Sequence, residues 1–233
     1  MIGVLSDAHG NGPTFKLVCN YLFSIGVKDL VFLGDSVGYI PSLSVVDFLM
    51  SNQEVFSCIK GNHEEMLLTG DYPDASEDVY KMKNISAMLT SSQRNYLASW
   101  PQFLDRVYPS GKVTFIHGSP DNYLNGYVYP DSDLDGFDID SEFIFMGHTH
   151  RPFVRKYSDK TYVNVGSSGL PRDDARYVSA ALFDPNTGQV KIIRLDVTNL
   201  DLASYLGKNN VHPSVLKLLD RRADNIVGDI VAG

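Results

Sequence analysis

Eight side chains that can ligate a metal stand directly after short apolar runs of this chain. They lie in the stretches SDAHGN, LGD, KGNHE, IHG and GHTH, which hold five of the six histidines. Neutral imidazole together with carboxylate suits Zn, Fe, Mn, Co or Ni, so the set predicts transition-metal chemistry. The eight residues are Asp7, His9, Asp35, Asn62, His63, His117, His148 and His150.

These ligands are too many for one ion, so they predict two. Asp35 has two carboxylate oxygens and can bridge both ions. Two-metal sites hold their ions about 3.5–4 Å apart and clamp the attacking and leaving oxygens of a displacement at phosphorus. On an extended strand end, both rings of an H-x-H pair point to the same side, so each can reach one ion. The first ligand set is Asp7, His9, Asp35 and His150, and the second is Asp35, Asn62, His117 and His148.

Short strands must position these residues, and β-branched or aromatic runs bounded by Gly, Pro, Asn or Asp predict them. Helical patterns at 14–25 and 42–50, the latter with Ser42 as N-cap, separate the early runs and favour parallel pairing. Ligands bind beyond the carboxyl ends of such strands, so the polar side chains converge if the strands are neighbours. The runs that precede them span 2–5, 30–33, 55–59, 113–116 and 143–146.

The second half of the chain loses the helical patterns. Four runs there predict a meander of antiparallel strands, with a turn at PNTG. These runs span 154–157, 162–165, 178–183 and 190–195.

Two further segments are helical in pattern. Residues 64–100 predict two or three helices, an insert that could cap the pocket, although its apolar positions favour packing. We expect one domain over 1–197 and a helical tail over 198–233, in which Pro213 begins a helix.

The motifs DAH, GD, GNHE, HG and GHTH, in this order, resemble the calcineurin-like metallophosphoesterase superfamily. The resemblance runs from Met1 to about Arg194 and is nearest to the small bacterial and archaeal phosphodiesterase-type branch, where GDSVGYIP and VNVGSSGLPRD have counterparts. It implies an α/β fold, a four-layer αββα sandwich of two mixed sheets flanked by helices.

The resemblance also implies roles for these positions. Asp35 and Asn62 join the catalytic machinery as ligands. His63 is the non-ligand histidine that contacts the scissile phosphate or protonates the leaving oxygen. A hydroxide bridging two divalent ions would be the nucleophile, with Mn expected first and Fe, Zn, Ni or Co as alternatives.

Phosphodiester or nucleotide-type substrates are therefore expected first, and phosphomonoesters second. A phosphoprotein phosphatase ranks lower because the short chain shows no recognition module. The competing class is a non-catalytic scaffold of the same fold, against which the intact ligand set argues.

Weaker signals surround this set. Arg172 in GSSGLPRD could bind a substrate phosphate or be an exposed loop arginine. Tyr123, with Asn125, Tyr127 and Tyr129, could stack on a nucleobase or aryl group, or form a plain loop.

Residues 131–142, DSDLDGFDIDSE, fit the calcium-loop pattern of an EF-hand. Pro130 precedes them, no amphipathic helix leads in, and Asp138 occupies a position that is usually apolar. An acidic surface loop is the favoured interpretation.

Composition limits the partners. The chain has 233 residues, a net charge of −8 and a sequence pI of about 5.1, which disfavours an extended nucleic-acid interface. Its two cysteines, Cys19 and Cys58, form no C-x-x-C motif. With no signal peptide and no apolar stretch near the roughly 18 residues of a membrane span, we expect a cytoplasmic protein. Its expected partner is a small phosphoester, and the oligomeric state is left open.

Overall fold

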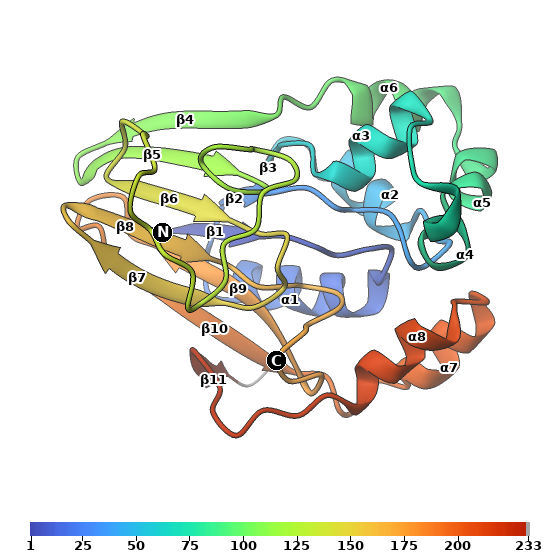
Figure 1. Ribbon diagram of the computed structural model, residues 1–233. Helices are drawn as coiled ribbons and strands as arrows, with labels where there is room; N and C mark the ends of the chain where they lie inside the picture. The colour runs from blue at the N-terminus through green and yellow to red at the C-terminus, as the bar shows by residue number, and fades with distance from the viewer. Residues whose placement is uncertain (232–233) are drawn as a thin grey trace.

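Two β-sheets packed face to face form the centre of the computed structural model, which describes residues 1–231 (Figure 1). The strand order is β11-β10-β9-β1-β2-β3 in the first sheet and β4-β5-β6-β8-β7 in the second. The first sheet contains β1 (Ile2–Leu5), β2 (Asp29–Phe32), β3 (Phe56–Cys58), β9 (Tyr177–Phe183), β10 (Val190–Asp196) and β11 (Asp229–Val231). The second contains β4 (Phe103–Tyr108), β5 (Gly111–Ile116), β6 (Phe143–Met146), β7 (Phe153–Tyr157) and β8 (Lys160–Asn164).

Each sheet contains three neighbouring parallel strands. β1, β2 and β3 are parallel and are connected through helices α1 (Gly12–Ser24) and α2 (Ser44–Ser51). In the second sheet β5, β6 and β8 are parallel. The predicted class is confirmed: two mixed sheets lie against each other and are flanked by helices.

The predicted meander is wrong as a single sheet. β7 and β8 form a hairpin in the second sheet, whereas β9 and β10 form one in the first. The segment between β8 and β9 crosses from one sheet to the other, because β9 pairs with β1 rather than with β8. Each hairpin is locally antiparallel, so local pattern alone does not distinguish one sheet from two.

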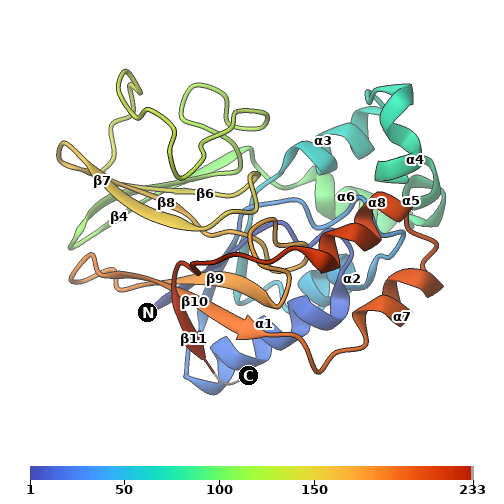
Figure 2. The same ribbon diagram turned by 60° about the horizontal axis from the view of Figure 1, so that its bottom comes forward.

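Apolar side chains form separate layers. Val4, Phe115, Phe145 and Phe183 belong to the cluster between the sheets. On the outer face of the first sheet, α1 and α2 pack against it through residues such as Phe15. The outer face of the second sheet is covered by the irregular segment 117–142, the yellow-green loops above β6 in Figure 2.

The insert contains α3 (Asn62–Thr69), α4 (Glu77–Tyr80), α5 (Met82–Met88) and α6 (Ser91–Ala98), with a short 3₁₀ turn at Asp74–Ser76. Leu67, Met82, Ile85 and Leu97 are buried in the same cluster as Phe15. The apolar positions of the insert therefore serve packing, as their pattern indicated.

The last part of the chain forms α7 (Leu202–Lys208), α8 (Pro213–Leu216), a 3₁₀ turn at Lys217–Asp220 and β11, which the sequence analysis did not predict. Pro213 begins α8, as expected. Ser42 is not the N-cap of α2, because the helix begins one residue later, with Leu43 at that position. Within residues 1–231 the helices are too short or too polar to span a membrane.

Replacing Phe15 with alanine is expected to lower the free energy of unfolding by about 3–5 kcal/mol, as for other buried aromatic truncations. The ring is fully buried and makes edge contacts with Phe32 and Phe48, at centroid distances of 5.5 and 5.6 Å. Urea denaturation would measure the change. The matched control is the exposed neighbour on α1, Lys16→Ala, and a Phe15→Ala protein as stable as this control would contradict the assigned core.

Candidate metal centre

The eight residues predicted to ligate or surround metal ions lie together at one end of the two-sheet sandwich. They follow the carboxyl ends of β1, β2, β3, β5 and β6, so strands of both sheets contribute. Seven of the eight are buried, and Asn62 is partly exposed. The convergence expected from the strand ends is therefore present, although it joins two sheets rather than neighbouring strands of one.

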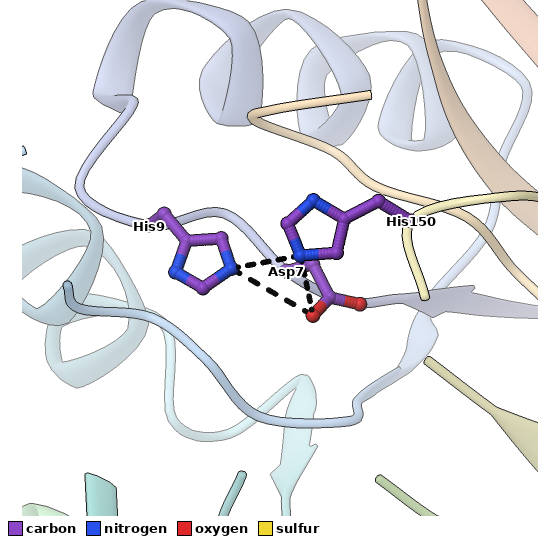
Figure 3. Close-up of side chains that lie close together, drawn as sticks. All are labelled: Asp7, His9 and His150. Carbon is purple, nitrogen blue, oxygen red and sulfur yellow. Dashed lines mark hydrogen bonds and ion pairs between the residues drawn. The ribbon is translucent and has the colours of Figure 1, made fainter. Parts of the chain in front are cut away.

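Asp7, His9 and His150 form the first group of side chains (Figure 3). The Asp7 Oδ1 atom lies 3.3 Å from His150 Nε2 and 3.8 Å from His9 Nε2. The two Nε2 atoms are 3.0 Å apart. Three donor atoms from two distant chain segments thus face one small volume.

The second group is centred on His117. Its Nε2 atom lies 3.1 Å from Asn62 Oδ1, 3.1 Å from His148 Nδ1 and 3.4 Å from Asp35 Oδ2. The same Asp35 oxygen is 3.5 Å from His9 Nε2, in the first group. Asp35 therefore lies between the groups, where a bridging carboxylate would be needed.

Backbone carbonyls fix the orientation of three imidazole rings. The Nδ1 atoms of His9, His117 and His150 lie 3.0, 2.8 and 2.5 Å from the carbonyl oxygens of Val37, Leu33 and Leu170. A proton on each Nδ1 leaves the Nε2 lone pair directed into the site, the arrangement in which histidine ligates a metal. His148 is turned the other way and presents Nδ1.

The ionisation of the group fits metal ligation. Burial opposes ionisation of Asp7 and Asp35, yet neighbouring imidazoles hold both pKa values below their usual range. Burial lowers the pKa of His63 to about 4 and of His148 to about 3. Burial acts against the charged form of His117 too, but Asp35 raises that pKa to about 9. A cation at this position would take the place of the His117 proton.

The backbone here departs from the extended conformation expected for H-x-H. His148 and His150 have φ values of 64° and 57°, and Asp7, His9 and Asp35 have 56°, 48° and 59°. These values lie in the left-handed region, which costs energy for residues other than glycine. The prediction that His148 and His150 lie on an extended strand end was wrong, because tight left-handed turns direct the two rings.

Close packing of loops accompanies these turns. Gly34 has a φ of 95°, and a Cβ atom at this position would collide with the backbone of Gly61. The loops after β2 and β3 therefore approach through two glycines, which brings Asp35 next to the start of α3.

Glu64 ends the GNHE motif but was not among the eight predicted site residues. Its buried carboxylate accepts hydrogen bonds from the backbone nitrogens of Asp35 (2.7 Å), Ser36 (2.6 Å) and Gly61 (2.9 Å), and from the Ser36 hydroxyl (2.7 Å). Burial, together with the charge of Asp35, raises its pKa. Glu64 thus holds the loops after β2 and β3 together.

Aromatic rings enclose His63. Tyr39 stacks on it at 5.1 Å, and Tyr80 of α4 lies 4.8 Å away. The insert therefore reaches the site through Tyr80. His63 Nδ1 is buried without a hydrogen-bond partner, and its Nε2 lies 3.9 Å from Asp35 Oδ2.

The two suggested substrate residues lie in different surroundings. Arg172 donates a hydrogen bond to the Tyr39 hydroxyl at 2.8 Å, so it borders the cluster. Tyr123 packs against Phe103 at 5.3 Å on the outside of the second sheet. The tyrosine of this loop that reaches the cluster is Tyr127, whose ring centre is 4.1 Å from that of His148.

The residues fit two divalent transition-metal ions. Asp7 Oδ1 is buried without a hydrogen-bond partner, and only a positive group would make its surroundings of inward-facing Nε2 atoms favourable. The nitrogen and oxygen donors are those such ions prefer. Segment 131–142, by contrast, lacks the flanking helices of an EF-hand and forms a loop.

Comparisons with known proteins agree with this chemistry. A family model described as the calcineurin-like phosphoesterase superfamily domain matches residues 1–188. A probable metallophosphoesterase of Methanothermobacter thermautotrophicus is 28% identical over 145 residues, covering 59% of this chain and 73% of that protein. An uncharacterized protein of Methanocaldococcus jannaschii is 29% identical over 218 residues, covering 84% and 87%. The crystal structure of a metallophosphoesterase from Sphaerobacter thermophilus superposes with a TM-score of 0.77 at 23% identity, covering 94% and 97%.

Replacing His117 with alanine should weaken binding of one of two ions by about tenfold or more, since loss of even an outer-shell contact costs about 10–100-fold. Calorimetric titration of the metal-stripped protein with Mn²⁺ would measure the affinity and the number of ions. The control is His212→Ala, because His212 is the sixth histidine and lies at the start of α8, outside the cluster. Two ions bound with unchanged affinity by His117→Ala would refute the second group.

Glu64→Gln should lower the free energy of unfolding by about 1–3 kcal/mol, because an amide cannot accept all the hydrogen bonds that now end on a buried carboxylate. It should also weaken Mn²⁺ binding, since Asp35 loses its support. The adjacent Glu65→Gln is the control: Glu65 is partly exposed and pairs with Lys60 at 3.0 Å. Equal stability and equal metal affinity in the two variants would refute a supporting role for Glu64.

Proposed function

The chain belongs to the calcineurin-like phosphoesterase superfamily, and we propose that it is a two-metal phosphoesterase acting on phosphodiester or nucleotide-type substrates. The observation that carries this proposal is Asp35, whose Oδ2 atom lies 3.5 Å from His9 Nε2 in one donor group and 3.4 Å from His117 Nε2 in the other. A single ion would not use both groups. A scaffold would not need this buried set of partly unpaired donors, which is costly without a cation.

Seven side chains are proposed to hold the two ions. Asp7, His9, Asp35 and His150 would hold one ion, and Asp35, Asn62, His117 and His148 the other. When bound, two such ions supply Lewis-acid stabilisation of phosphoryl oxygens and water of lowered pKa. Mn²⁺ is the proposed metal, and Fe, Zn, Ni and Co are alternatives with the same donor preferences.

His63 is proposed to act on the substrate itself. Burial keeps its ring neutral, with a pKa of about 4, and a neutral imidazole carries one N–H. That N–H can donate to an oxygen of the scissile phosphate or of the leaving group. The rings of Tyr39 and Tyr80 hold His63 in place for this contact.

Two features favour a diester or nucleotide over a simple monoester. Tyr127 and Tyr129 are exposed and stack at 5.9 Å with 7° between their planes, and the Tyr127 ring adjoins His148. They offer a flat face for a nucleobase. A cavity of about 400 Å³ also opens at Asn62 and includes Glu65 and Asp71, so it suits an uncharged leaving group better than an anionic one.

Phosphomonoester hydrolysis is the second candidate, because the N–H of His63 can also donate a hydrogen bond to the leaving oxygen of a monoester. A phosphoprotein phosphatase is disfavoured, because the short chain shows no recognition module for a protein substrate. The reducing cytoplasm is the proposed location, in keeping with the free thiols Cys19 and Cys58.

Bis-p-nitrophenyl phosphate is expected to be hydrolysed faster than p-nitrophenyl phosphate when Mn²⁺ is present, with no turnover after the metals are stripped. His63→Gln should lower kcat by about 10²–10³-fold, the usual cost of losing one well-placed hydrogen-bond donor to transition-state charge, while two ions remain bound. Absorbance assays and metal analysis of the same samples would measure both. A folded, metal-loaded protein without turnover on either ester, or a fully active His63→Gln, would overturn the proposed chemistry.

A further inference from the structure

A second cavity, of about 420 Å³, is lined by four arginines next to the metal centre. Three separate chain segments supply them. Arg151 follows the GHTH motif, Arg172 comes from the GSSGLPRD loop, and Arg221 and Arg222 come from the tail. The tail lies against that loop, because Arg221 donates to the carbonyl of Arg172 at 2.8 Å. In Figure 2 this part of the chain is the red segment that runs from α8 back to β11.

The positive charge of this cavity is not neutralised within the protein. Over residues 1–231, no carboxylate oxygen lies within 4.0 Å of a charged nitrogen of these four arginines. The acidic residue that lines the cavity, Asp173, is paired instead with the buried Arg194, at 2.6 and 3.1 Å. Partial burial and the charges of Arg172 and Arg151 lower the pKa of Arg221. In a chain with a net charge of −8, this cavity gathers four arginines without a carboxylate partner among the described residues, and such a cluster attracts anions.

The cavity adjoins the first donor group through Arg151 and Arg172. Arg151 is adjacent to His150 in the chain, and the backbone nitrogen of Arg172 donates to the His150 carbonyl at 3.2 Å. The Arg172 side chain also reaches Tyr39, whose ring contacts His9 at 4.8 Å. The Nε atom of Arg172 is buried and has no hydrogen-bond partner. An anion in the cavity would therefore be bound immediately beside a phosphate at the metal centre.

We propose that the four-arginine cavity binds a second phosphate group of the substrate, apart from the one that is hydrolysed; this inference rests on the proposed function. Guanidinium groups bind phosphate through paired charge-assisted hydrogen bonds. The volume lies within the range of about 300–1,000 Å³ that is typical of small-molecule sites.

The cavity beside the second donor group indicates how the substrate is oriented. The cavity at Asn62 includes the carboxylates of Glu65 and Asp71, which repel a phosphate. The uncharged leaving group would lie there, and the part of the substrate that carries the second phosphate would lie toward Arg151.

Two chromogenic esters that share one scissile bond test this assignment: thymidine 5′-(p-nitrophenyl phosphate) with and without a 3′-phosphate. For the unmodified protein with Mn²⁺, the 3′-phosphate is expected to lower KM by about tenfold or more, which each well-made charge-assisted contact can supply. Arg151→Gln combined with Arg222→Gln should remove most of that gain. Lys191→Gln combined with Lys208→Gln is the control, because both lysines are exposed and lie outside the cavity.

The outcomes separate the two proposals. Equal KM values for the two esters in the unmodified protein would overturn the second-phosphate site and leave the phosphoesterase intact. If neither ester is hydrolysed, the proposed function fails, and calorimetry with thymidine 3′,5′-bisphosphate then decides the cavity: affinity lost in the arginine variant supports it, and unchanged affinity overturns it.

Free inorganic phosphate is the alternative ligand of the cavity, and a separate titration tests for it. Inorganic phosphate is titrated into the unmodified protein and the arginine variant. Arginine-dependent binding of inorganic phosphate, together with equal KM values for the two esters, would show a separate anion site and overturn the substrate assignment.

Discussion

The buried carboxylate of Asp35 is the contact on which the rest of the site depends. Its Oδ1 atom accepts a hydrogen bond from the backbone of His63 at 2.9 Å, which fixes the start of α3. Its Oδ2 atom faces imidazoles from both sheets, 3.5 Å from His9 and 3.4 Å from His117. An uncompensated charge at this depth is costly, so the surroundings must supply positive or hydrogen-bonding groups. The bonds of Glu64 to the backbone at Asp35 and Gly61 hold that arrangement in place.

The two sheets hold the strained backbone of the site in its conformation. Asp7, His9, Asp35, His148 and His150 all have left-handed backbones, and such strained positions persist only where the surrounding structure determines them. Here the backbone nitrogen of His148 donates to Asp7 Oδ2 at 3.0 Å, which ties the end of one sheet to the end of the other. The apolar cluster between the sheets keeps these two ends in register.

Much of the site could be predicted because its residues follow predictable strands. The runs before Asp7, Asp35, His117 and His148 are short, apolar and bounded by turn residues, so their ends and the family resemblance place the candidate ligands. Sheet membership was harder, since the hairpins β7–β8 and β9–β10 look alike in pattern and differ only in a distant partner. β4 was missed because the adjacent charged residues Asp105 and Arg106 interrupt its apolar run, and β11 because it is three residues long.

The roles of two other features could not be predicted from local sequence patterns. Glu64 has the pattern of a helix N-terminus, and only the folded loops show that its carboxylate accepts bonds from Asp35, Ser36 and Gly61. The four-arginine cavity joins Arg151 with Arg222, 71 positions apart (222 − 151). No spacing rule connects residues at such a distance, so long-range contacts alone define this surface.

The pairing of β1 with β9 also bears on how the chain reaches its native state. Val4 is aligned with Ala181, so this strand of the first sheet gains that neighbour only after the first 181 of the 233 residues are available. Contacts of such long sequence separation slow folding, because the loop must close before the contact stabilises anything. During synthesis, β1, β2 and β3 would emerge first and expose one unpaired strand edge until residues near 181 leave the ribosome. His9 and His150, 141 residues apart, also come together late, so the first donor group is completed only after this long-range contact forms.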